Sequence, residues 1–144
     1  MRTAIRRIGN SLGVIIPRAT LEQWGVAEGD ALLVDRHGIR PESPPSPETL
    51  DRLKHAIALE TVRHFSTRQI RAKILANLHR WKAQGAWVSA YDEWKAIAQS
   101  GDDGALYAAM IGQDEEANRL RQSMPFVGML PREEVRRLNE EATR

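Results

Sequence analysis

The chain has 144 residues, of which 42% are hydrophobic, a net charge of +2 and no cysteine. This length allows one ordinary domain or two small ones, and the composition is that of a globular protein. The lack of cysteine excludes a disulfide framework, a thiolate metal site and thiol catalysis.

The first 18 residues carry four arginines and no acidic residue, which favours a polyanionic partner such as nucleic acid. Thr3–Ile8 alternates loosely and predicts a strand, and Gly9-Asn10-Ser11 contains residue types that suit a tight turn. Leu12–Ile16 is apolar and β-branched, and predicts a buried strand. Together these segments predict a β-hairpin that presents a cationic loop.

A short helix, Arg18–Trp24, is predicted next, because Pro17 ends the strand and is tolerated at a helix start. Glu28-Gly29-Asp30 predicts a turn, and Ala31 to Arg40 a second hairpin that turns at His37-Gly38. A segment of this size cannot bury enough apolar surface alone. We therefore expect two copies of it to share one core as a homodimer.

This order of elements resembles the AbrB/MazE family of DNA-binding domains over about the first 40 residues. The matching residues are Arg6-Arg7-Ile8-Gly9-Asn10-Ser11 and Val14-Ile15-Ile16-Pro17, followed by the short helix, the Gly29-Asp30 turn and the second hairpin. The resemblance implies a swapped-hairpin β dimer. It also implies either the DNA-binding half of a bacterial antitoxin or a free-standing transcription regulator.

In that family the first strand and the loop after it meet the DNA duplex. The resemblance therefore implies DNA contacts from Arg6, Arg7, Asn10 and Ser11, with Arg18 as a weaker candidate. Arginine side chains can reach phosphates or guanine edges. For Asn10 and Ser11 a role in forming the turn alone is an equally good interpretation.

Pro41–Pro47 holds four prolines in seven residues and predicts a semi-rigid extended linker between residues 1–40 and residues 48–144. A ligand for an SH3-like domain is the weaker interpretation, because the segment lies where strand patterns stop and helix patterns start. We expect the two parts to fold independently.

The chain beyond the linker predicts helices, so the expected fold class is α+β, a small N-terminal β domain followed by an all-helical region. Ser46 and Pro47 suit a helix start, and Ser66 with Gln69 matches a capping box. The helix that follows places its apolar residues on one face. Further helices are expected from a cap at Ser89 to Gly101, from Asp103 to Ile111, from Asp114 through Arg121, and from Pro131 onward.

Two surfaces of the helical region are open to two interpretations. The first is basic, and could contact DNA or form the solvated flanks of a helix; its residues are Arg63, Arg68, Arg71, Lys73, Arg80 and Lys82. The second is the apolar segment Ser123–Pro131, which could pack in the core or bind a partner protein. The predicted partner-binding residues are Met124, Phe126, Met129 and Leu130.

Catalysis finds little support in the sequence. The four histidines are scattered, and none forms the i, i+4 pair of a helical zinc site. No nucleophile elbow or phosphate-binding loop is present. One acidic pair, Asp102-Asp103, and one acidic triplet, Asp114-Glu115-Glu116, begin predicted helices. The helix dipole stabilises acidic side chains at such positions. We expect no enzyme activity, no cofactor and no metal.

The favoured function is an antitoxin that binds double-stranded operator DNA as a dimer and neutralises a cognate toxin through its helical region. The alternative is a free-standing AbrB-like regulator with a helical oligomerisation or effector domain. Antitoxins of this family usually end in a short, acidic, flexible tail, whereas this chain carries about a hundred residues of capped helices. No stretch approaches the length of a membrane span or a signal peptide, so we expect a cytoplasmic protein with no membrane partner.

Overall fold

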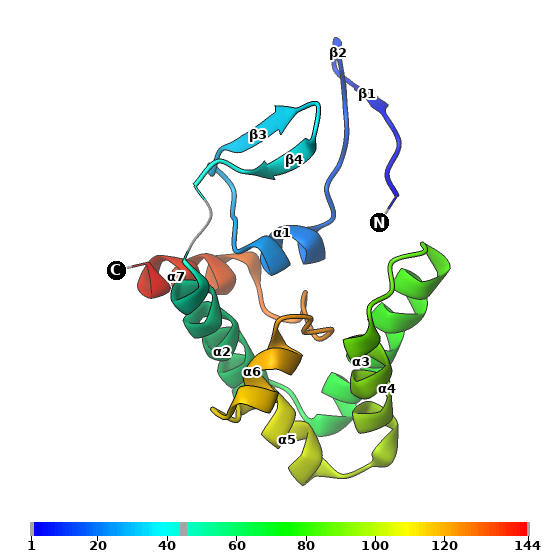
Figure 1. The fold of residues 1–144 in the computed structure, drawn as a ribbon, viewed down its shortest axis with the longest axis vertical. Helices are drawn as coiled ribbons and strands as arrows, with labels where there is room; N and C mark the ends of the chain where they lie inside the picture. The colour runs from blue at the N-terminus through cyan, green and yellow to red at the C-terminus, as the bar shows by residue number, and fades with distance from the viewer. Residues whose placement is uncertain (1, 44–45, 144) are drawn as a thin grey trace.

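A computed structural model describes residues 2–43 and 46–143. In these residues the N-terminal part forms two β-hairpins with a short helix between them, and the rest forms a body of helices (Figure 1). The N-terminal elements are β1 (Arg6–Ile8), β2 (Ser11–Gly13), α1 (Arg18–Trp24), β3 (Leu32–Asp35) and β4 (Gly38–Pro41). The helices of the body are α2 (Pro47–His64), α3 (Thr67–Ala83), α4 (Ser89–Ser100), α5 (Asp103–Ile111), α6 (Glu115–Arg121) and α7 (Arg132–Ala142). The predicted α+β class is confirmed.

The two hairpins form separate two-stranded sheets. In the first, β1 pairs antiparallel with β2, with Arg7 opposite Leu12. Gly9 has a φ of 60°, a left-handed conformation that glycine adopts without the penalty a side chain would bring. Both strands are shorter than predicted. Leu12 is 71% exposed in the single chain, so the predicted burial of the second strand depends on the expected second copy. In the part of the chain that the structure describes, the β3–β4 sheet is separate and does not pair with this hairpin.

Side chains that cap the helices explain where most of them begin. The Ser46 hydroxyl accepts the Thr49 N–H at the start of α2, and Ser66 and Gln69 form the predicted capping box of α3. The predicted cap at Ser89 is wrong: Val88 is the N-cap of α4 and makes no side-chain cap, so Ser89 is the first residue inside the helix. The predicted helix starts at Asp103 and after Asp114 are confirmed.

The core lies within the helical body. Ile70, Ile74 and Leu78 of α3 are buried, as their helical spacing predicts. The Trp94 ring of α4 meets the Phe126 ring edge to face, with centroids 5.6 Å apart, and its indole N–H donates to the Leu120 carbonyl at 2.9 Å. Aromatic packing therefore ties α4 to the segment between α6 and α7.

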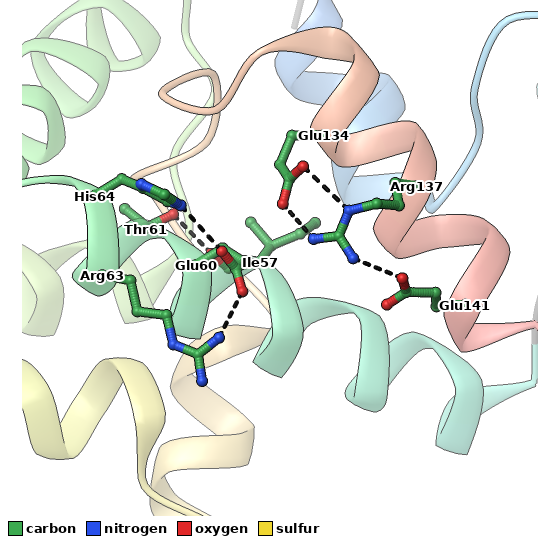
Figure 2. A network of polar contacts seen from close by, with 8 residues as sticks. All are labelled: Ile57, Glu60, Thr61, Arg63, His64, Glu134, Arg137 and Glu141. Carbon is green, nitrogen blue, oxygen red and sulfur yellow. Dashed lines mark hydrogen bonds and ion pairs between the residues drawn. The ribbon is translucent and has the colours of Figure 1, made fainter.

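Helices α2 and α7 pack together and carry polar pairs (Figure 2). On α2, the Glu60 carboxylate is paired with Arg63 at 2.8 Å and with His64 at 3.2 Å. On α7, Arg137 is held between Glu134 and Glu141. All these pairs join residues three or four positions apart, so they stabilise each helix rather than the contact between the two. Within the described residues, no helix is long and apolar enough to cross a membrane.

Helix α1 is docked on the helical body, so the proline-rich segment is not the only connection between the two parts. Its residue Ala19 packs against the core of the body, and the Asn139 amide of α7 donates to the Gly25 carbonyl at 3.3 Å. The expected linker is also shorter than predicted, because Pro41 ends β4 and Pro47 begins α2. Its central residues Pro44 and Pro45 lie outside the described residues.

Candidate nucleic-acid interface

The β1–β2 hairpin carries the four strongest predicted DNA-binding residues on exposed positions. Arg6 and Arg7 lie in β1, and Asn10 and Ser11 form the turn and the start of β2. In the part of the chain that the structure describes, neither arginine pairs with a carboxylate. The hairpin therefore presents uncompensated positive charge, which is what a phosphate backbone binds.

Strand geometry separates the two arginines of the hairpin. Successive residues of a strand point to opposite faces, so Arg6 lies on one face of the hairpin and Arg7 on the other. Arg7 shares its face with Leu12, which is its cross-strand partner, and Ile8 on the opposite face covers Gly13. A hairpin that lay flat on DNA would use only one arginine. One that enters a groove by its edge or tip can use both.

Arg18, the weaker candidate, is engaged in another contact. Its Nε donates to the Glu22 carboxylate at 2.7 Å, and its Nη2 donates to the Leu130 carbonyl at 2.7 Å. The guanidinium thus fixes the start of α1 to the segment before α7. This arrangement leaves the predicted DNA role of Arg18 without support.

The expectation of an exposed adhesive loop at residues 123–131 is wrong. Met124 and Leu130 are buried, Phe126 is only 1% exposed, and Met129 is partly buried against the core. The cause is the buried Asn77 of α3, whose amide donates to the Pro125 carbonyl at 2.8 Å and to the Val127 carbonyl at 3.2 Å. These four residues form core, which is the other interpretation that the sequence allowed.

Large apolar side chains are exposed instead on and beside the two hairpins. Ile5 and Val34 are each 73% exposed, and Ile8, Leu12 and Ile15 are exposed as well. The sequence analysis did not name these exposed residues, although it did predict that the segment cannot bury its apolar residues alone. These side chains lie on both faces of the first hairpin and on the second hairpin, so apolar surface of both sheets is uncovered in the single chain.

The basic residues of α2 and α3 differ in their surroundings. Arg63 pairs with Glu60, and Arg71 pairs with Asp103 of α5. Arg68, Arg80 and Lys82 are exposed, and no carboxylate in residues 2–43 or 46–143 pairs with them. These last three remain available to an anionic partner. A hollow of about 340 Å³ lies elsewhere, between the turn after α1 and α7, and contains none of the predicted site residues.

Residues 5–45 match the family model described as antidote-toxin recognition MazE, bacterial antitoxin. The match covers both hairpins and α1, so the chain carries an N-terminal AbrB/MazE-type domain of about 40 residues, as the sequence motifs predict. No curated protein and no solved structure matches the chain. The domain supports an antitoxin-like protein or an AbrB-type regulator, and the match leaves the helical body outside it.

Proposed function

We propose that the chain is an antitoxin that binds operator DNA as a homodimer through its N-terminal hairpins and neutralises a cognate toxin through its helical body. The observation that carries this proposal is the match of residues 5–45 to a MazE antitoxin domain. In this proposal the protein works in the cytoplasm by binding and has no catalytic role. The division into residues 1–40, a linker and residues 48–144 remains a prediction.

The uncovered apolar residues of the hairpins support the dimer. Leu12 is 71% exposed and Val34 is 73% exposed in the single chain, although both lie in strands. Burial of a side chain of this size stabilises a protein by about 1.5–3 kcal/mol. A second copy that interleaves its hairpins with the first would cover these residues and supply the sheet that each hairpin lacks.

The charge of the first hairpin supports DNA as the ligand. Within residues 2–43 and 46–143 no carboxylate pairs with Arg6 or Arg7, and a dimer would present four such guanidinium groups. Backbone contacts position a protein on the duplex, and bidentate contacts to guanine carry sequence preference. We propose that the hairpin enters a groove by its edge, because only that approach uses both arginines of a chain.

The description of the matching family, toxin recognition, supports a toxin as the protein partner. Because the apolar segment 123–131 is core, the toxin would contact the outer surface of the helical body. The alternative function, an AbrB-like regulator, is favoured by one observation: the described residues 46–143 form a packed body where an antitoxin would carry a flexible tail. In that alternative the body serves oligomerisation or effector binding.

Binding of the full chain to a duplex from upstream of its own gene tests the DNA function. The R6Q/R7Q variant should bind much more weakly. Its salt dependence should flatten by up to roughly four units per dimer if all four arginines contact phosphate. The matched control is R132Q/R136Q, which removes the same charge from exposed positions of α7. Equal affinities for the wild type and R6Q/R7Q would place the DNA surface elsewhere.

The toxin function needs a separate experiment. The full chain is co-expressed with the product of the neighbouring gene, and cell growth and co-purification are measured. Rescue of growth together with a stable complex supports the antitoxin. If the neighbour is harmless and does not bind, while operator binding persists, the regulator replaces the antitoxin.

A further inference from the structure

The segment 61–91 contains no aspartate or glutamate. It holds six lysines and arginines and two histidines, and it spans the end of α2, all of α3, the loop to α4 and the first three residues of α4. Residues 92–116 have the opposite character, with seven acidic residues and one lysine. The helical body is therefore electrically asymmetric, and a polyanion would approach the side that α3 forms.

The cations at the end of α3 are not neutralised within the protein. Arg80 and Lys82 lie in the last turn of α3, beside the exposed His79. No carboxylate of the described chain pairs with either of them. By contrast, Arg119 of α6 contacts both Glu93 and Glu116. Arg80 and Lys82 therefore keep their positive charge available to an external anion.

These two cations are also held in place. The Arg80 guanidinium donates to the Asn77 side-chain oxygen at 2.8 Å, and Asn77 is itself fixed by the carbonyls of the core segment. The Lys82 ammonium lies 5.3 Å from the centroid of the Trp87 ring. The Trp87 indole N–H donates to Asp92 at 3.3 Å. Side chains that are already positioned lose less conformational entropy when they bind a ligand.

The turn between α3 and α4 faces the same way as the DNA-binding hairpin. In Figure 1 the β1–β2 hairpin rises at the top of the molecule, and the α3–α4 turn, in green, points upward at the right. Helix α5, which begins at Asp102 and Asp103, lies at the lower end of the same view. Both uncompensated cationic elements thus lie on the side away from the acidic start of α5, while Asp92 of α4 lies beside the α3–α4 turn and accepts the Trp87 N–H.

We propose that Arg80 and Lys82 form a second DNA-contact site, which binds the phosphate backbone beside the site of the hairpin. This inference rests on the proposed DNA function of the hairpin. A phosphate contact carries no sequence information, so the second site raises the affinity for every duplex to the same degree. The hairpin alone would then distinguish the operator from other DNA.

Fluorescence anisotropy with the full chain at several salt concentrations tests this proposal. The probes are a duplex from upstream of the gene and an unrelated duplex of equal length. R80Q/K82Q should weaken binding to both by about tenfold or more at 0.1 M salt, and the salt slope should fall by up to roughly two units per chain. R132Q/R136Q is the charge-matched control on exposed positions of α7.

Each outcome decides the proposal. The proposal is overturned if R80Q/K82Q binds like the wild type or if R132Q/R136Q weakens binding equally. It is also overturned if R80Q/K82Q loses a protein partner but not DNA. If the wild type binds neither duplex, the proposed DNA function fails first. R80Q/K82Q could melt at a lower temperature because Asn77 has lost its Arg80 partner. In that case the single variant K82Q decides, because Lys82 does not contact Asn77. The proposal then requires that K82Q weakens binding to both duplexes.

Discussion

Glu22 and Gly128 are 106 residues apart in the sequence, yet the Glu22 carboxylate accepts the Gly128 amide N–H at 3.1 Å. The same carboxylate pairs with Arg18, which also donates to the Leu130 carbonyl. The Glu22 side chain is only 5% exposed, so its charge is compensated by these two donors rather than by water. This contact holds α1 of the MazE-type domain on the helical body.

Replacement of Glu22 by Ala should destabilise the full chain by about 1–3 kcal/mol, because the Gly128 N–H and the Arg18 guanidinium lose a partly buried acceptor. Urea denaturation followed by circular dichroism measures this change. Glu28→Ala is the control, since Glu28 is exposed and meets Arg132 only at 3.6 Å, and it should change stability by less than about 0.5 kcal/mol. Equal stability of the two variants would mean that α1 is not held by Glu22.

Phe126→Ala should reduce the free energy of unfolding by about 3–5 kcal/mol, because it leaves a cavity beside Trp94 in the core. Thermal melts of the full chain report the loss, and Val88→Ala, at an exposed position before α4, should leave the melt almost unchanged. A Phe126→Ala protein with wild-type stability and reduced toxin binding would instead restore this segment as a binding surface.

Sedimentation velocity at micromolar concentration should find the full chain as a dimer. Leu12→Ser with Val34→Ser should shift it towards the monomer, because both side chains lie uncovered on the hairpins of the single chain. Tyr107→Ser changes an exposed residue of α5 and should leave the dimer intact. A wild-type chain that sediments as a folded monomer would refute the dimer and the shared core.

Hydrogen bonds from Arg119 lower the pKa values of Glu93 and Glu116 from their ordinary value of 4.5. Because each folded pKa lies below the unfolded one, the stabilisation is complete above the unfolded pKa and is lost as the pH falls through the folded pKa. The melting temperature of Arg119→Gln should therefore be lower than that of the wild type at pH 7, and the difference should vanish in acid.

Thermal melts from pH 7 to strongly acidic pH measure this difference, and NMR titration of the two carboxyl groups should show both pKa values rising in the variant. Arg136→Gln is the control, because Arg136 lies 3.4 Å from Glu140 on the exposed face of α7. A difference that persists unchanged below the folded pKa values would show that Arg119 acts through packing alone.

The sequence predicts well what depends on neighbours within a few residues. The capping box of Ser66 and Gln69 and the buried stripe of α3 follow from local spacing, and the family motifs identify the MazE-type domain. The core position of Phe126 is different, because it is decided by Trp94 and Asn77, which lie far away in the sequence. An apolar loop looks the same in sequence whether it meets its own core or a partner.

The surroundings of Leu12 and Arg18 also depend on contacts that the sequence does not show. A β-branched strand predicts burial, but the sheet that would cover Leu12 is not part of the single chain. An arginine beside a cationic hairpin suggests DNA, but Arg18 is occupied by a carboxylate one helical turn away and by a carbonyl from the far end of the chain. Sequence reports charge and periodicity, and it does not report which groups the tertiary fold has already paired.

The docking of α1 makes it difficult to combine the N-terminal domain of this protein with the helical body of another protein. The MazE-type domain carries on α1 two polar residues, Arg18 and Glu22, that are satisfied by the helical body, and its Gly25 carbonyl accepts a hydrogen bond from Asn139. If the domain were fused to another helical body, Arg18 and Glu22 would lose their hydrogen-bond partners at Leu130 and Gly128. Recombination that separates the two parts is therefore disfavoured, and we expect the hairpins and their helical body to be inherited as a unit.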